Sequence, residues 1–163
     1  MNKILFFILM LTFTAQLSAQ KSLPSVSIRT LEGKAIDSKA IPTEGKITIL
    51  SFWATWCAPC KKELDEITKS YAQWQKDYNV ELVAISIDNA QGLPKVKPMV
   101  SQKSWKYRIL SDVNSQFLNS LGGQSVPYTI LLDKKGNIVD IHNGYKPGDE
   151  KELEHKIAEL SKK

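Results

Sequence analysis

The fold is decided by the stretch Ile47-Thr48-Ile49-Leu50-Ser51-Phe52-Trp53-Ala54-Thr55-Trp56-Cys57-Ala58-Pro59-Cys60-Lys61-Lys62-Glu63. Its first part, residues 47–53, is β-branched and aromatic, which is typical of a buried strand. After Pro59 the apolar residues recur three or four positions apart, which predicts the buried face of a helix. These residues are Leu64, Ile67, Tyr71, Trp74 and Tyr78. The stretch therefore predicts a strand followed directly by a helix, with Cys57 at the junction.

Cys57 and Cys60 are the only two cysteines of the 163-residue chain. The first turn of a helix has free N–H groups and a partial positive charge, so we expect a lowered pKa for the Cys57 thiol. Pro59 suits the same turn, because its missing N–H would have no partner there. The two-residue spacing lets Cys60 form a disulfide with Cys57. Such a pair can attack a substrate disulfide and release the product by a second attack.

Other uses of the cysteine pair remain open. A structural disulfide across so short a loop would stabilise the chain little. A zinc site needs two further ligands, and the only histidines, His142 and His155, have no ligand spacing. The main alternative function is a module that binds or transfers a soft metal such as Cu(I) between the two thiolates. No histidine or methionine lies close in the sequence to complete such a site.

Residues 52–63 resemble the active-site stretch of the TlpA/ResA-like thiol-disulfide oxidoreductases. These are extracytoplasmic bacterial members of the thioredoxin superfamily, and the resemblance covers nearly the whole chain after the first 19 residues. It implies a thioredoxin-like fold and an enzyme that needs no cofactor and acts as a monomer. Its substrates would be exported proteins with disulfides, and a membrane thiol-reductase would supply electrons. ResA-like relatives act on apocytochromes c, which implies a role in cytochrome c biogenesis. A peroxidase is less well supported, because the cysteines have thioredoxin rather than peroxiredoxin spacing.

The resemblance also implies a set of substrate-binding residues. Pro127 matches a proline that is cis in thioredoxin-like proteins and faces the cysteine pair. The backbone of Val126 would then lie beside Cys57 and pair with an extended substrate segment. Trp56, Ala58 and Pro59 are expected at the rim of the same site, and Trp53 in the core.

Glu63 is the third residue to which we assign a catalytic role, after Cys57 and Cys60. It lies three residues after Cys60, hence on the same side of the helix. It also matches a glutamate that is associated with redox chemistry in ResA-like proteins. Classical thioredoxins place an aspartate six residues before the first cysteine, where this chain has Ser51. The alternative is a purely structural acidic residue in the first helical turn.

Residues 1–19 are expected to be a signal peptide that directs the protein to the periplasm. Lys3 supplies a positive charge, residues 4–13 form an almost unbroken apolar run, and small residues precede a cleavage point after Ala19. An uncleaved membrane anchor is the alternative. The chain has a formal charge of +5, but its lysines are scattered among acidic residues. No basic stripe is present, so nucleic-acid binding is not indicated.

Residues 20–163 are predicted to form one thioredoxin-like domain of the α/β class, with a mixed central sheet, helices on both faces and an N-terminal β-hairpin extension. The hairpin is expected at residues 26–36, and further strands at 80–87, 107–110 and on both sides of a turn at 133–136. Helices are expected at 94–103, where Pro98 would start or kink the helix, from Asp112 to Leu121, and from Asp149 onward. No site with a bound metal is predicted.

Overall fold

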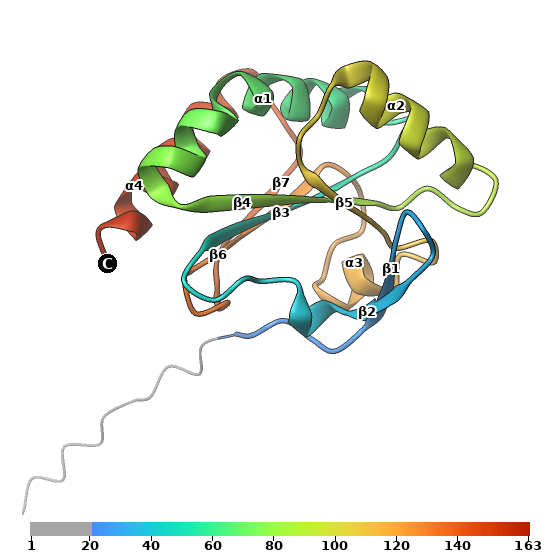
Figure 1. Cartoon of the computed structure of the whole chain (residues 1–163), viewed down its shortest axis with the longest axis horizontal. Helices are drawn as coiled ribbons and strands as arrows, with labels where there is room; N and C mark the ends of the chain where they lie inside the picture. The colour runs from blue at the N-terminus through green and yellow to red at the C-terminus, as the bar shows by residue number, and fades with distance from the viewer. Residues whose placement is uncertain (1–20) are drawn as a thin grey trace, which may run out of the picture.

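The centre of the fold is a seven-stranded sheet, seen in a computed structural model that describes residues 21–163 (Figure 1). The strands follow the order β2-β1-β5-β4-β3-β6-β7. They are β1 (Ser27–Thr30), β2 (Ala35–Asp37), β3 (Ile47–Trp53), β4 (Val80–Ser86), β5 (Arg108–Ser111), β6 (Tyr128–Leu132) and β7 (Ile138–Asn143). The helices are α1 (Ala58–Tyr78), α2 (Val96–Lys103), α3 (Gln116–Ser120) and α4 (Asp149–Ser161). The predicted signal peptide, residues 1–19, lies outside the described residues.

The sheet is mixed, as the sequence predicts. β3 pairs with β4, and β4 with β5, in parallel. The pairs β1–β2, β1–β5, β3–β6 and β6–β7 are antiparallel. The predicted N-terminal hairpin is therefore confirmed as β1–β2, and the turn at residues 133–136 joins β6 to β7. The parallel strands carry the cysteine site at their carboxyl end.

β3 is buried along its whole length, because it lies between β4 and β6 and both faces of the sheet are covered. Ile49 and Trp53 pack into a core on one face, and Leu50 and Phe52 pack into a core on the other. A strand that is buried on both faces has no solvent-facing positions that favour polar residues, which explains why residues 47–53 are mostly apolar.

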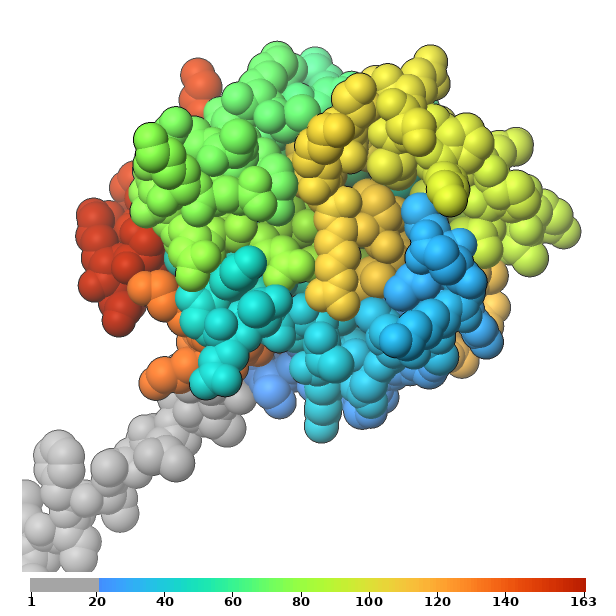
Figure 2. Space-filling model, in the orientation of Figure 1, coloured from blue at the N-terminus to red at the C-terminus, as the bar shows by residue number. Residues whose placement is uncertain are grey.

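Helices cover both faces of the sheet, but unequally. α1, α2 and α4 lie on one face, where Trp74, Val96 and Ile157 share a core with Trp53 (Figure 1). On the other face, Phe117 of the short α3 packs with Ile28 of β1. The space-filling view shows α1 in green and α2 in yellow along one side, and the N-terminal hairpin in blue on the opposite side (Figure 2). The hairpin extends the sheet beyond β5 and contributes Ile28 to the core on the face that has only the short α3.

Two predicted helices differ from expectation in detail. Pro98 neither starts nor kinks α2. It is the third residue of that helix, where its missing N–H needs no partner. α3 is shorter than predicted, because Ser115 has a left-handed φ of 53° and precedes the helix. Asp112 accepts a hydrogen bond from the N–H of Leu118 at 2.9 Å and so holds α3 from the preceding turn. Within residues 21–163, no helix is both long enough and apolar enough to cross a lipid bilayer.

Candidate active site

Cys57 and Cys60 form a disulfide at the junction of β3 and α1. Cys57 is the N-cap of α1, and the N–H of Cys60 donates to the Cys57 sulfur at 3.2 Å. Pro59 lies in the first turn, as expected. After reduction the same N–H group and the helix N-terminus would stabilise a thiolate on Cys57.

Both cysteine side chains are buried. Cys57 is 4% exposed and Cys60 is fully buried. The carbonyl oxygen of Val126 lies 3.7 Å from the Cys57 sulfur and covers part of it. The rim residues predicted to contact substrate are exposed, in contrast to the two cysteines. Trp56 is 67% exposed, and Ala58 and Pro59 are exposed as well. A partner would therefore meet Trp56 first and reach the Cys57 sulfur only at close approach.

The segment before β6 completes this face of the site. The Val126–Pro127 peptide bond is cis, which confirms the expectation for Pro127. Pro127 is buried, and Val126 is partly exposed beside Cys57. The backbone of Val126 therefore lies where the resemblance placed a substrate-pairing segment.

Glu63 is a buried acid, not a charge at the helix terminus. α1 begins at Ala58 and has no acidic residue in its first turn, so the expected first-turn position of Glu63 is wrong. Glu63 lies one turn further along and is 4% exposed. The Thr129 hydroxyl donates to its Oε1 at 2.8 Å, whereas Oε2 has no hydrogen-bond partner among the described residues. Burial raises the pKa of Glu63 to about 7, against the opposing effects of the Thr129 hydrogen bond and of His142.

Ser51 stands on β3 where classical thioredoxins place an aspartate. It is buried and pairs with Thr129 across the β3–β6 register. Directly opposed residues of an antiparallel pair point to the same face. That face is the one covered by α1, because Ile49 and Trp53 share it. The acid of this site therefore comes from the helix, above a strand position that carries only a hydroxyl.

The structure also brings three residues to Glu63 that the sequence reasoning missed. These are Thr129, His142 and Asp149, which line one small cavity with Glu63. The sequence pattern predicts only a helix start at Asp149, and it predicts no role for His142, which lacks metal-ligand spacing. A signal was present in β7, where the polar residues Asp140 and His142 alternate with Val139 and Ile141. That alternation places both polar side chains on one face.

Asp88, in the segment after β4, holds the turn that precedes Cys57. Its Oδ2 accepts hydrogen bonds from the N–H of Thr55 and from the hydroxyl of Ser86, each at 2.8 Å. Its Oδ1 accepts from the Thr55 hydroxyl at 2.6 Å. A Cβ atom at Gly92 would lie 2.8 Å from the same Oδ1, so the close approach requires glycine there. Lys61 donates to the carbonyl of Thr55 at 3.0 Å and fixes the turn from the helix side.

Comparison with known proteins places this arrangement in a family. A family model described as "AhpC/TSA family" matches residues 19–141. The chain belongs to this family. Over 120 residues it is 32% identical to the thiol-disulfide oxidoreductase ResA of Bacillus thuringiensis, and the match spans 74% of this chain and 66% of that protein. The chain thus spans slightly less than two thirds of the length of that relative.

Two further members support the same placement. The sporulation thiol-disulfide oxidoreductase A of Bacillus subtilis is 32% identical over 121 residues, which are 73% of this chain and 71% of that protein. A solution structure of an uncharacterized thioredoxin-like protein from Porphyromonas gingivalis superimposes with a TM-score of 0.78 at 41% identity. That match covers 86% of this chain and 92% of the other. The expected thioredoxin-like fold is therefore confirmed. Among residues 21–163, no group of three or more His, Cys, Asp or Glu side chains is placed to hold a metal ion.

Proposed function

We propose that this protein is an exported thiol-disulfide oxidoreductase that reduces disulfides in other proteins. The observation that carries the proposal is the Cys57–Cys60 disulfide at the N-terminus of α1, with the Val126 carbonyl 3.7 Å from the Cys57 sulfur. A thiol there is activated by the helix end, and a backbone strand segment beside it can hold an extended peptide. The names of the related thiol-disulfide oxidoreductases support the same activity.

The reaction proceeds in two exchanges. The Cys57 thiolate attacks a substrate disulfide, forms a mixed disulfide and releases one substrate sulfur. Cys60 then loses its proton, attacks the Cys57 sulfur and releases the second substrate sulfur. Glu63 accepts the Cys60 proton, since it lies one helical turn from Cys60 and burial raises its pKa to about 7. A carboxyl group with such a pKa takes up and gives back a proton near neutral pH.

The proposal also covers the cellular location of the protein and its partners. The signal-peptide pattern in residues 1–19 supports export to the periplasm, where a membrane thiol-reductase would return the pair to the dithiol form. A monomer is sufficient for this reaction, because one chain supplies Cys57, Cys60, Glu63 and Val126. The substrates are exported proteins with disulfides, with apocytochromes c as one class. The exposed Trp56 and the partly buried Met99 line a shallow groove of about 390 Å³ that can receive the flank of the substrate segment.

Trapping tests the function directly. Cys60→Ser removes the resolving thiol, so Cys57 should accumulate mixed disulfides with its substrates in the periplasm. These complexes can be separated without reductant and identified. Cys57→Ser is the matched control and should trap nothing. If Cys60→Ser expressed in a periplasm forms no mixed disulfide, or if Cys57→Ser traps the proteins instead, the proposal fails.

A further inference from the structure

A row of polar side chains crosses the face of the sheet that α1 and α4 cover. Ser51 of β3 pairs with Thr129 of β6, and Thr129 pairs with His142 of the edge strand β7. Residues paired in this way point to the same face, so the three side chains lie in line. The neighbouring positions on that face, such as Ile49 and Leu131, are apolar core. The row therefore leads from the strand that carries the cysteine site to the edge of the sheet, about 10 Å across two strand spacings.

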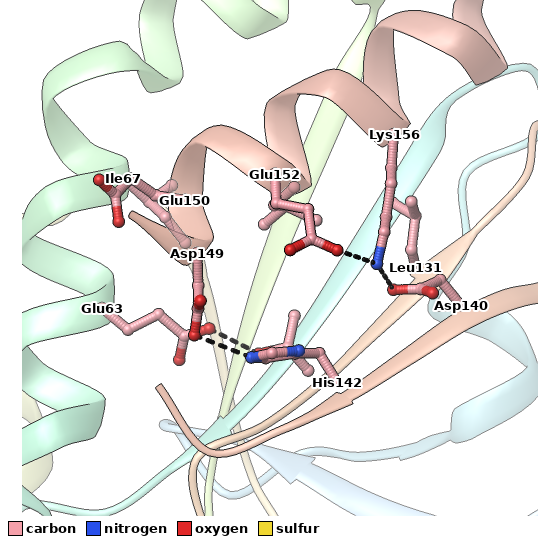
Figure 3. Close-up of a pocket in the computed structure, with 11 residues that line it drawn as sticks. Glu63, Ile67, Leu131, Asp140, His142, Asp149, Glu150, Glu152 and Lys156 are labelled. Carbon is pink, nitrogen blue, oxygen red and sulfur yellow. Dashed lines mark hydrogen bonds and ion pairs between the residues drawn. The ribbon is translucent and has the colours of Figure 1, made fainter. Parts of the chain in front are cut away.

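Glu63 and Asp149 lie above this row. Thr129 donates to Glu63 Oε1 at 2.8 Å, and His142 Nε2 lies 3.0 Å from Asp149 Oδ2. Figure 3 shows Glu63 of α1, Asp149 of α4 and His142 of β7 with their polar ends directed toward one another. Glu63 is distant in sequence from the other two residues, whereas His142 and Asp149 come from the consecutive elements β7 and α4. All three meet where α1 and α4 pack on the sheet.

The space between them is a cavity of about 20 Å³, lined by Glu63, Thr129, His142 and Asp149. That volume is sufficient for one water molecule, which needs roughly 10–15 Å³. Glu63 Oε2 is buried and lacks a partner among the described residues. At the other end the His142 side chain is 38% exposed and that of Asp149 is 25% exposed. The cavity therefore joins a buried carboxyl group to an imidazole that solvent reaches.

We propose that His142, oriented by Asp149, exchanges protons between Glu63 and solvent through a water held in this cavity. An imidazole can accept and donate a proton near neutral pH. The route ends at the β7 edge, away from Cys57, so it stays open while a substrate protein covers the cysteines. His142 acts only through Glu63 and is a positioning residue of the reaction. This inference deepens the proposed function and rests on its resolving step.

The proton and electrons balance as follows. The Cys60 thiol gives its proton to the Glu63 carboxylate. The Cys60 thiolate then forms a bond to the Cys57 sulfur, and the bond between Cys57 and the substrate sulfur breaks. The electron pair leaves on the substrate sulfur, which takes a proton from solvent. The cysteine pair is oxidised and the substrate reduced. Glu63 finally passes its proton to the water and to His142, which returns it to solvent.

Other charged groups face Glu63, and they bear on its titration. His142 lowers the pKa of Glu63 and Asp149 raises it. Burial raises the pKa of Tyr107 on the segment before β5 and of Tyr145 on the loop after β7, and Glu63 adds a smaller contribution in the same direction. Glu150 of α4 lines the cavity and hydrogen-bonds Tyr145. Lys156 of α4 lines it too, but is paired with Asp140 and Glu152. His142 is thus the basic side chain of this set that is directed at Glu63 and is not shared between two carboxylates.

The test uses the folded full-length domain and a probe that needs no natural substrate. Glutathione is attached to Cys57 as a mixed disulfide, and its release by Cys60 is followed after a pH jump. The pKa of Glu63 is read separately from its side-chain carboxyl resonance in NMR spectra of the oxidised protein. His142→Gln should slow release by more than about threefold and raise the pKa of Glu63 by more than about 0.3. His155→Gln, at the exposed histidine of α4, should change neither.

A smaller change in either quantity for folded His142→Gln overturns the inference. In His142→Ala, added imidazole should restore release, because the cavity opens at an exposed position; failure of rescue also overturns it. If His142→Gln does not fold, Asp149→Asn takes its place, because it keeps the imidazole of His142 and removes the carboxylate that orients it. Release of glutathione from Asp149→Asn should then slow by more than about threefold. If the wild-type protein reduces no protein disulfide but releases glutathione as described, the proposed function fails and this inference stands.

Discussion

Folding disfavours the ionised form of the Glu63 side chain, because the carboxyl group is buried. Burial raises its pKa from 4.5 to about 7, so the folded protein binds this proton more tightly than the unfolded chain. Stability from this group is therefore complete below about pH 4.5 and falls as the pH rises through about 7. Glu63→Gln removes the ionisable group. In denaturant unfolding of the oxidised protein, it should raise the free energy of unfolding by about 2 kcal/mol more at about pH 8 than at about pH 5.

The control for that comparison is Glu44→Gln, because Glu44 is exposed. Its effect on unfolding should be the same at both pH values. An equal effect of Glu63→Gln at both values would mean that the buried carboxyl is ionised and solvated throughout the range.

Thr129 lowers the pKa of Glu63, whereas burial raises it. Its hydroxyl donates to Glu63 Oε1 at 2.8 Å and favours the ionised form. Thr129→Val keeps the shape of the side chain and removes the donor, so it should raise the pKa of Glu63 by about 1, measured from the carboxyl resonance. Thr48→Val is the matched control. Thr48 is also a buried threonine of the sheet, and its hydroxyl has no partner among the described residues. A comparable shift in both variants would assign the effect to general burial.

At this scale the sequence predicted the reacting groups but not the groups that support them. Spacing alone places Cys57, Cys60 and Glu63 on one end of one helix, since all three lie within two turns. Thr129 lies 66 positions from Glu63 and meets it only through the register of β3 with β6. His142 is one strand further away. Side-chain types along a single strand do not reveal which helix will lie above them.

At the scale of elements, the link between β4 and the turn before α1 is the most specific feature. The Asp88 carboxylate accepts two hydrogen bonds from Thr55 and one from Ser86. Asp88→Asn puts an amide group against these donors, so it should cost about 1–3 kcal/mol of stability. Because Thr55 positions the residues before Cys57, alkylation of reduced Cys57 should also change. Asp77→Asn, on the exposed side of α1, should alter neither property.

Unaltered stability in Asp88→Asn would show that the turn is held by the Lys61 contact instead. The two readouts, unfolding and Cys57 alkylation, can be taken on the same samples.

Helices and strands were predicted best where a regular sequence pattern extended over many residues. β3 and α1 were predictable from an unbroken apolar run and a regular three-and-four spacing. α3 was overestimated, because Ser115 leaves helical geometry and Asp112 reaches past it to the N–H of Leu118. Pro98 was ambiguous, since a proline marks a first turn as readily as a kink, and only the start of α2 at Val96 decides between them.

At the scale of the whole molecule, the cysteine surface and the β7 edge are separate surfaces. Trp56, Ala58 and Val126 surround Cys57, whereas His142 lies two strands away from β3. In a mixed disulfide trapped with Cys60→Ser, hydrogen exchange should slow in the backbone of residues 54–58 and 124–127. Exchange in residues 139–142 of β7 should stay as in the free protein. Protection of β7 would mean that a substrate covers both surfaces and would close the route proposed for the proton.

The exposure of Trp56 has an optical consequence. Of the four tryptophans, it alone is largely exposed, at 67%, whereas the others are at most 5% exposed: Trp53, Trp74 and Trp105. An aqueous quencher such as iodide should therefore reach a single indole, and that indole is the neighbour of Cys57. Its emission should respond when the disulfide is reduced and again when a partner docks. The chain thus carries its own fluorescent reporter, and the redox state and occupancy of the site should be readable without any label.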